Sequence, residues 1–420
     1  MAVKADNKNI LNAIRANMSL EYRERIPNAT AENIAEIYDN LLNIMPLRNA
    51  FVNALVTQIM EQRIETGFFK NPLGVLKREP MRYGMTEEEI YINMAKGYQF
   101  NQFASVNDLY AYYKSEVMAA YHRITPPMQY AVTVTYDNLR NAFRSETGIR
   151  ELINAKVQSL FMGAEWDEYL CMKQIFESAY KAGHLYARHV SPITDYESGS
   201  ALTKLIKADI GKMQFPSPMY NVAGATSSAT AESIFYITTP EVDASLTVDV
   251  LANAFNMEKV SLNTRKIIID KFDNPNIQLI AFDMRFLNVR ENFRQLSDSR
   301  NGAALTWNYF LTISEMFSYS PFFPVVVYTT EEVGVDSITI KDSTYTAGTD
   351  TNIELEISGK AYTPEMVDLS VENNTSAYTS FIPGSNILHV ANDEKANTLT
   401  VKAVSRYNNT VKSEKVINKV

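Results

Sequence analysis

The sequence has one cysteine, little glycine and no excess of positive charge. Cys171 permits no disulfide within the chain and lies among apolar residues, so we expect a small buried hydrophobic side chain and folding in a reducing compartment. The 15 glycines form neither a Walker loop nor a G-x-G-x-x-G motif. The net charge of -8 disfavours sequence-reading contact with nucleic acid, which needs clustered Lys and Arg.

The motifs of active sites, metal sites and membrane segments are also missing. None of the four histidines stands in an H-E-x-x-H pattern; His184 and His189 could share a metal, but a surface or capping role near a helix end is the favoured interpretation. Asp270, Asp273 and Asp283 flank expected strand ends and could bind a cation, but their spacing matches no cation-binding loop. The polar N-terminus has no apolar signal segment, and no eighteen-residue window is apolar throughout. We therefore expect no catalysis, no cofactor, no bound metal and no membrane contact.

The most regular stretch runs from Gly148 to Gly183 and predicts one long helix. Its apolar residues recur at spacings of three and four, which places them on one stripe. At 1.5 Å per residue the helix would span roughly 50 Å, long enough to act as a spine for other elements. Gly163 lies inside it, either tolerated at a cost of about 1 kcal/mol or marking a bend.

The residues before this helix predict short helices around a long extended hairpin. Helices are expected at residues 30–45, 49–64 and 106–124, and alternating apolar residues predict a strand at 130–136. Between them, residues 68–103 contain scattered Gly and Pro, and Ile90, Ile92 and Met94 alternate as in a half-buried strand. This pattern predicts the hairpin.

The hairpin carries opposite charges on the two sides of Gly84. Lys77, Arg78 and Arg82 precede Gly84, and three glutamates follow it at residues 87–89. A solvated surface hairpin would explain this pattern. A loop that lies on a neighbouring subunit would explain it too, because opposite charges across an interface fix register.

After the long helix the pattern becomes mixed α/β, and near Thr330 it changes again. Strands are expected at 233–238, 265–271, 277–282, 305–313 and 325–328, with helices near 201–208 and 242–255. From Glu331 onward only short β-like runs and polar turns occur, which predicts a small sandwich of about 90 residues. This last part has no Cys and no Trp, so it lacks the disulfide and tryptophan of an antibody domain.

Five stretches, which together cover most of residues 25–330, carry a resemblance to a known family. They are RIPNATAENI with NAFVNALVTQI, NPLGVLKREPMRYGMTEEEIYINMAKGY, YAVTVTYDNLRNAFRSETGIRELINAKVQSLFMGAEWDEYLCMKQIF, ITTPEVDASLTVDVLANAFN, and NGAALTWNYFLTISEMFSYSPFFPVVVYT. These strings resemble the major capsid proteins of small short-tailed phages, the phi-twenty-nine-like and picovirus-type podoviruses.

This resemblance implies an α+β fold of the Hong Kong 97 capsid type, followed by an all-β immunoglobulin-like sandwich. The implied ranges are an N-terminal arm with helices (1–67), an E-loop (68–104), a peripheral domain (105–189) with its spine helix (148–183), an axial domain (190–300), return strands of the peripheral domain (301–330) and the sandwich (331–420). The last range resembles a bacterial immunoglobulin-like group 2 module.

The implied function is mechanical: the chain would self-assemble into the icosahedral head of a tailed bacteriophage and enclose its double-stranded DNA. The implied partners are copies of itself in hexamers and pentamers, scaffolding and portal proteins, and packaged DNA through weak non-specific contact. The virion would be its location, after assembly in the cytoplasm of the bacterial host. The residues expected to contact a neighbouring subunit are Phe68, Phe69, Lys77, Arg78, Arg82, Tyr83, Glu87, Glu88, Glu89 and Tyr91.

Two other functions compete with this one. A surface- or carbohydrate-binding protein could use the C-terminal module, but it would be expected to carry a signal peptide. A cytoplasmic enzyme with an unfamiliar active site is the third possibility. Shells, tubes or capsomers of the expressed protein would favour the first function, and a stable monomer that binds glycans would favour the second.

Overall fold

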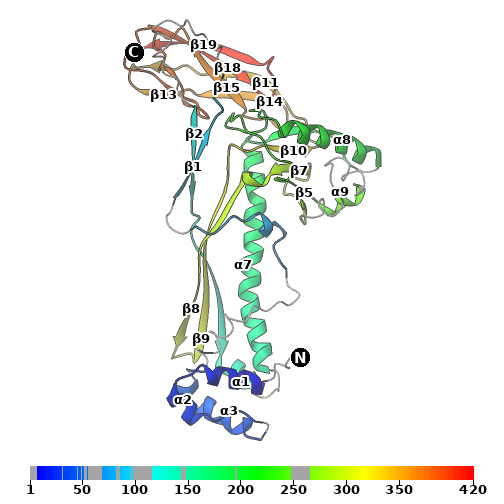
Figure 1. The fold of residues 1–420 in the computed structure, drawn as a ribbon, viewed down its shortest axis with the longest axis vertical. Helices are drawn as coiled ribbons and strands as arrows, with labels where there is room; N and C mark the ends of the chain where they lie inside the picture. Colours follow the sequence, from blue (N-terminus) through cyan, green and yellow to red (C-terminus); the bar gives the residue numbers. More distant parts are fainter. Residues whose placement is uncertain are drawn as a thin grey trace. The chain divides into compact units, whose positions relative to one another are not determined.

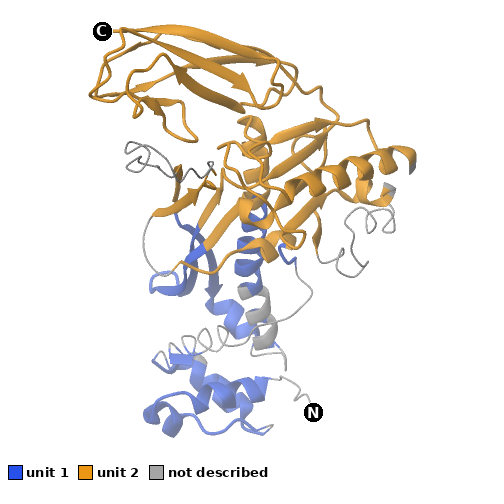
Figure 2. Ribbon diagram, turned by 45° about the horizontal axis from the view of Figure 1, so that its top comes forward, with its two compact units in different colours: residues 1–71, 125–170, 291–315 blue, residues 72–124, 171–290, 316–420 orange. Residues whose placement is uncertain are grey.

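The structure is a computed structural model of the 420-residue chain. It forms two compact units, coloured separately in Figure 2. Unit 1 comprises residues 1–71, 125–170 and 291–315, and unit 2 comprises residues 72–124, 171–290 and 316–420. The residues that the structure describes are 7–30, 32–44, 46–48, 50–51, 54, 69–81, 86–95, 97, 116–142, 148–193, 196–246 and 265–420.

Unit 1 packs short helices and a three-stranded sheet against the first part of the long helix. The sheet order is β3-β9-β8, with β3 and β9 antiparallel from Met128↔Ile313 to Thr135↔Thr306. Its core includes the fully buried Leu41, Phe51 and Trp307. The elements are α1 (Asn7–Ala16), α2 (Leu20–Arg25), α3 (Ile34–Asn43), β3 (Met128–Thr135), α6 (Tyr136–Ala142), α7 (Gly148–Lys181, to Leu170 in this unit), β8 (Leu287–Asn301) and β9 (Thr306–Tyr319), the last two also shared with unit 2.

Helix α7 confirms the predicted spine (Figure 1). It ends at Lys181, and Gly183 follows with φ +71°, the left-handed conformation that often closes a helix. The amide of His184 donates to the carbonyl of Ala179 at 3.0 Å, which satisfies one of the last free carbonyls. Cys171 is half-buried, so the expectation of a buried small hydrophobic side chain was wrong.

Unit 2 is built on a five-stranded mixed sheet in the order β4-β10-β7-β5-β6. Strands β5 and β10, on either side of the central β7, are buried along their whole length, as near-continuous apolar runs require. The C-terminal part of α7 packs on this sheet, with the rings of Phe176 and Phe282 5.0 Å apart. The elements are η1 (Pro72–Leu76), β1 (Thr86–Ile92), β2 (Val117–Arg123), β4 (Tyr186–His189), α8 (Tyr196–Met213), β5 (Ile234–Thr238), α9 (Pro240–Ser245), β6 (Lys266–Ile268), β7 (Ile277–Asp283), η2 (Met284–Phe286) and β10 (Val325–Thr329).

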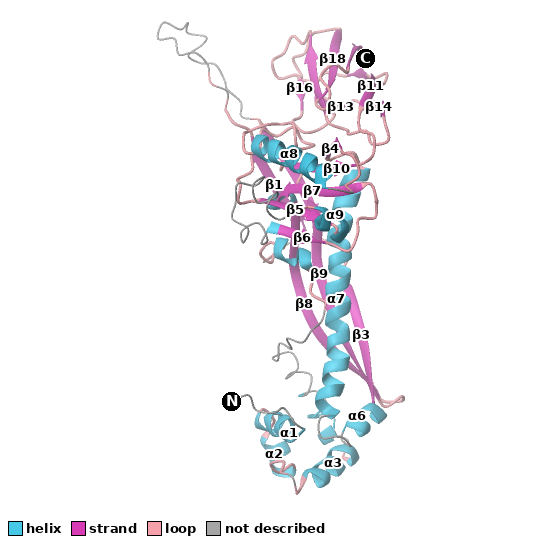
Figure 3. Ribbon diagram, turned by 90° about the vertical axis from the view of Figure 1, so that its right-hand side faces the viewer, coloured by secondary structure: helices cyan, strands magenta, loops and turns pink. Residues whose placement is uncertain are grey.

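The C-terminal residues of unit 2 fold into small sheets with a core of their own. Residues 331–420 contain strands and no helix (Figure 3). The sheets are β11-β14, β12-β19-β18-β15 and β13-β17-β16, and they enclose a buried apolar cluster that includes Leu388, Leu399 and Val401. The strands are β11 (Val335–Ile340), β12 (Thr344–Tyr345), β13 (Asp350–Asn352), β14 (Leu355–Gly359), β15 (Val367–Glu372), β16 (Ser380–Phe381), β17 (Ile387–His389), β18 (Thr398–Ser405) and β19 (Lys412–Lys419).

This C-terminal part, residues 331–420, is docked firmly on the remainder of unit 2. The ring of Tyr362 stacks on Tyr180 at 4.2 Å, and its hydroxyl donates to the carbonyl of Leu185 at 2.5 Å. Met366 is fully buried in the cluster that also contains Tyr186 and Tyr328 of the five-stranded sheet. A core shared in this way fixes the position of the C-terminal part within unit 2.

Three expectations from the sequence differ from the structure. The helix expected at 106–124 is wrong for residues 117–123, which form strand β2, and its residues 106–115 lie outside those described. The return strand of the hairpin is this same β2, so it lies beyond the expected range 68–104. Strand β8 was missed because most of its residues are polar and exposed, and so carry no apolar alternation. Most of the helix expected at 49–64 falls outside the described residues.

Candidate functional site: the β1–β2 hairpin

Strands β1 and β2 form a two-stranded antiparallel sheet, and they lie side by side in Figure 1. The register runs from Thr86↔Arg123 to Ile92↔Val117 without a bulge. Because alternate residues of a strand point to opposite faces, the hairpin has an inner face that is covered by the rest of unit 2 and an outer face that is exposed.

The part of the inner face around Glu87, Glu89 and His122 is polar and is anchored by ion pairs. Glu87 pairs with Arg290 at 2.9 Å and accepts a hydrogen bond from Nδ2 of Asn288 at 2.9 Å. Glu89 lies 3.1 Å from Nε2 of His122, whose Nδ1 lies 2.9 Å from the hydroxyl of Ser318. These contacts connect both strands to β8 and β9.

The pKa of Glu89 reflects this anchoring. Burial alone would raise the pKa of a carboxyl group, but hydrogen bonds from His122 and Ser320 and the charges of His122 and Arg78 outweigh it, so the pKa of Glu89 is lowered. The hairpin is therefore held by a carboxylate that stays ionised in the folded chain.

An aromatic contact completes the inner face at its far end. The ring of Tyr91 stacks on Phe322 at 5.5 Å, and its hydroxyl donates to the carbonyl of Thr226 at 3.0 Å. Met118 of β2 is buried in the same cluster, together with Ala225. The inner face thus changes from polar to apolar along the hairpin.

The outer face is an exposed apolar strip, formed by Ile90, Ile92, Val117, Ala119 and Tyr121 and called the outer strip below. Ile90 is 58% exposed, Ile92 63% and Tyr121 66%. Met94, 60% exposed, follows the strip along the chain, and the hydroxyl of Tyr121 donates to Glu88 at 2.9 Å. Exposed apolar surface that is continuous in this way commonly marks an interaction site.

The predicted contact residues divide between these two faces. Glu87, Glu89 and Tyr91 lie on the inner face and bind the chain's own body, whereas Glu88 lies on the outer face. The sequence predicted a half-buried strand, and the alternation is confirmed, but the covered face is the one that carries two glutamates. The outer strip was not among the predicted contact residues, although the alternation of Ile90 and Ile92 was visible.

The other predicted residues are distributed more widely. The amide of Arg78 donates to the carbonyl of Val289 at 2.9 Å, so Arg78 is fixed on β8, and Lys77 is half-buried beside it. Phe69 belongs to unit 1, where it contacts Trp166 edge-to-face at 5.0 Å. Phe68, Arg82 and Tyr83 lie outside the described residues.

The histidines and aspartates singled out in the sequence form no metal centre among the described residues. His184 and His189 have separate partners, the hydroxyl of Tyr319 at 2.6 Å and the carbonyl of Glu331 at 2.8 Å. Asp270 pairs with Lys173. Among the residues described, no group of three or more His, Cys, Asp or Glu could hold a metal ion, and none of their helices is long and apolar enough to cross a membrane.

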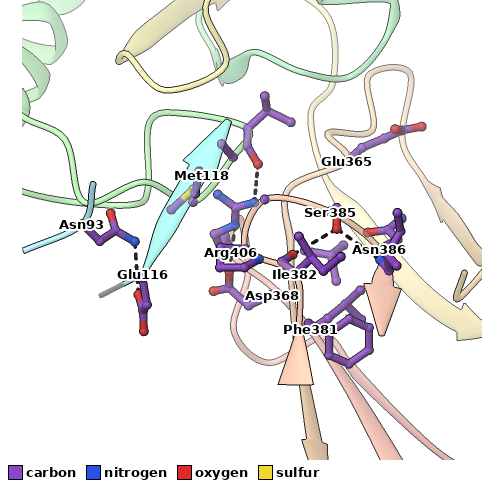
Figure 4. A pocket seen from close by; sticks show the side chains of 18 of the residues that line it. Asn93, Glu116, Met118, Glu365, Asp368, Phe381, Ile382, Ser385, Asn386 and Arg406 are labelled. Atoms are coloured by element: carbon purple, nitrogen blue, oxygen red, sulfur yellow. Dashed lines mark hydrogen bonds and ion pairs between the residues drawn. The ribbon is translucent and has the colours of Figure 1, made fainter. Parts of the chain in front are cut away.

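A cavity of about 580 Å³ lies beside the far end of the hairpin (Figure 4). Asn93, Glu116 and Met118 of the hairpin line one side, residues 222–224 line another, and the C-terminal part contributes Arg406 and others. The cavity therefore marks the place where these three segments meet within unit 2.

Comparison with known proteins assigns the family. The model of the "Phi29-like phage major capsid protein" family matches residues 11–329. The major capsid protein of Bacillus phage PZA is 26% identical over 406 residues, covering 95% of this chain and 90% of that protein. The major capsid protein of Bacillus phage B103 is 27% identical over 331 residues, covering 77% and 73% respectively.

The solved capsid structure of Staphylococcus phage Andhra resembles the chain with a TM-score of 0.49 and 14% identity, over 64% of this chain and 88% of that one. The family match agrees with the capsid family expected from the sequence, and the described helices and strands agree with the expected α+β class. Because the family model covers most of the residues from the first helices to the end of strand β10, the chain belongs to the Phi29-like phage major capsid protein family.

Proposed function

We propose that this capsid protein assembles into the closed icosahedral head of a tailed phage, and that the outer strip of its hairpin packs against a neighbouring copy. The observation that carries the proposal is the inversion of the hairpin: Glu87 and Glu89 are paired within the chain, whereas the apolar side chains of Ile90, Ile92 and Val117 face outward. The centre of a protein interface is depleted in charge and rich in aliphatic and aromatic groups, which is the composition of this strip. The rigid inner anchoring would present the strip with little loss of conformational freedom on binding.

The proposal includes further partners. We expect hexamers and pentamers of this chain, contacts with scaffolding and portal proteins, and assembly in the cytoplasm of the bacterial host. Because the net charge of -8 gives no overall attraction to DNA phosphates, we expect the contact with packaged double-stranded DNA to be weak and non-specific. We expect no catalytic activity. The assignment of residues 331–420 to an immunoglobulin-like module, and the six domain ranges, stay predictions.

The test is the assembly of a chain that carries a charge on the outer strip. Ile92→Glu places a carboxylate at the centre of the proposed interface, where its desolvation opposes association. We expect the purified variant to elute as monomer or capsomer in size-exclusion chromatography and to show no shells by electron microscopy. The wild-type chain should form shells, tubes or capsomer arrays under the same conditions.

A matched control separates assembly from folding. Val416→Glu makes the same kind of change at a residue of β19 that is 55% exposed. It should assemble like the wild type, and both variants should melt within a few degrees of it, because neither residue is buried. Normal shells from Ile92→Glu would refute the role of the outer strip.

A further inference from the structure

We propose that Arg406 is a positioning residue for the hairpin: through the loop of residues 217–227, called the seat loop below, it fixes the support on which the hairpin lies. The inference rests on the proposed function of the hairpin, because it concerns how the outer strip is held for a neighbour. It gives the C-terminal part of the chain a role in orienting the assembly surface.

Arg406 reaches from the end of β18 to the seat loop. Its Nη1 donates to the carbonyls of Asn221 at 2.7 Å and Pro218 at 3.2 Å, and its Nη2 donates to the carbonyl of Val222 at 2.5 Å. Its Nε lies 3.0 Å from the carboxylate of Asp368, and the arginine side chain is only 8% exposed. A planar guanidinium can hold three carbonyls at once because its donors are fixed in a fork.

The seat loop is shaped to accept this side chain. Gly224 has φ +70°, and a Cβ added there would lie 3.1 Å from Nη1 of Arg406. The side chain of Asn221 closes the loop, donating to the carbonyl of Ala225 at 2.7 Å and accepting from the amide of Ala225 at 2.8 Å. Asn221 is therefore held by Arg406 through its carbonyl and holds the next turn of the loop through its amide group.

The other side of the seat loop supports the hairpin. The carbonyl of Thr226 accepts a hydrogen bond from the hydroxyl of Tyr91, and the amide of Thr226 donates to Oδ1 of Asn93 at 2.9 Å. Met118 packs on Ala223 and Ala225 in one buried cluster. A continuous series of contacts thus runs from Arg406 through Asn221 and Ala225 to Met118 of the hairpin. Arg406 and Met118, the two ends of this series, line the cavity drawn in Figure 4.

Other contacts that dock the C-terminal part bypass the seat loop, and they provide the control. The hydroxyl of Tyr407 donates to the carbonyl of Ala187, and that of Tyr362 donates to the carbonyl of Leu185. Both acceptors lie at β4 of the five-stranded sheet. Removing one of these hydroxyls loosens the docking without touching the support of the hairpin.

The experiment is amide hydrogen exchange on the full-length, unassembled chain. In Arg406→Gln, exchange in β1 and β2 should accelerate about tenfold or more, because hydrogen bonds from a charged donor contribute at least that factor to an equilibrium constant. Arg406→Lys should restore part of the protection, since one ammonium can still serve a carbonyl. Tyr407→Phe should leave exchange in the hairpin at the wild-type rate.

A second variant covers the case in which Arg406→Gln does not fold. Asn221→Ala keeps the carbonyl that Arg406 binds but removes the link to Ala225, so the hairpin should exchange faster while β15 and β18 keep their protection. Unchanged exchange in the hairpin of either folded variant would overturn the proposal, as would equal acceleration by Tyr407→Phe. Since exchange is measured before assembly, its outcome is independent of whether Ile92→Glu blocks shell formation.

Discussion

Glu394 illustrates how one buried carboxylate can organise a turn. Its side chain accepts hydrogen bonds from the amide of Thr375 at 2.9 Å, the amide of Ala396 at 3.0 Å and the hydroxyl of Thr379 at 2.8 Å. The residue is only 2% exposed. Burial raises its pKa, but these donors outweigh burial and bring the pKa of Glu394 far below its usual value. Two loops of the C-terminal part are thereby tied together by a charge.

Replacing Glu394 should lower the free energy of unfolding and weaken the dependence of this free energy on pH. A carboxyl whose pKa is lowered by folding stabilises the folded state above its unfolded pKa of about 4.3, and that stabilisation is lost as the pH falls below this value. Glu394→Gln should therefore cost about 1–3 kcal/mol at pH 7 and progressively less in acid. Urea unfolding between pH 7 and pH 3 measures this. The exposed Glu356→Gln is the control, and an equal loss at all pH values would contradict the role of the charge.

At the scale of the element, the spine helix has a glycine where a strand crosses it. A Cβ added at Gly163 would lie 3.3 Å from Cδ1 of Tyr130 in β3, and the hydroxyl of Tyr130 donates to Asp167 at 3.0 Å. Both contacts lie within unit 1. The glycine that the sequence marked as tolerated or bending is explained by this close approach.

This explanation predicts that the effect of Gly163→Ala depends on Tyr130. Alanine favours a helix by about 1 kcal/mol over glycine, but the contact with the tyrosine ring opposes the gain. In a Tyr130→Ala background the gain should appear in full, so the two changes couple by roughly 1 kcal/mol in a double-mutant cycle of urea unfolding. Gly211→Ala, whose added Cβ meets nothing within 4 Å, should be independent of Tyr130. Additivity at Gly163 would disprove the coupling.

The elements also show where sequence reasoning succeeds and where it stops. The spine helix and the buried strand β5 were predictable because their patterns are long or strongly apolar. Strand β2 was mistaken for a helix because its run VMAAYHR is rich in helix formers, and pairing with β1 overrides that preference. For the hairpin, the alternation predicted the period but not which face is covered. The glutamates are paired by Arg290, far away in the sequence, and by His122 of β2, which was expected to be helical.

Over the whole molecule, the C-terminal part contributes to the stability of unit 2 in addition to its own fold. Met366 is fully buried among residues of the five-stranded sheet. Met366→Ala should therefore lower the free energy of unfolding by about 2–4 kcal/mol, as expected for a cavity in a core. Val416→Ala, at an exposed residue, should change it by less than about 0.5 kcal/mol. Differential scanning calorimetry of the full chain measures both.

A chain that ends at Thr330 extends this test. It would expose Tyr180 and Tyr186, which the C-terminal part covers, so it should melt at a lower temperature and bind more of a hydrophobic dye than the full chain. A truncated chain as stable as the full one would show that the C-terminal part does not stabilise the rest of unit 2.

The inverted hairpin has a consequence for the supply of subunits. If the outer strip binds a neighbour as proposed, each folded molecule exposes this binding surface before any neighbour arrives, because Ile90 and Ile92 face outward while Glu87 and Glu89 are paired on the inner face. Shell growth then needs no conformational change that exposes this surface, and its onset depends on the concentration of free subunits. Rapid synthesis would raise the concentration of free subunits and favour misassembled aggregates over closed heads. The rate of synthesis would therefore affect assembly.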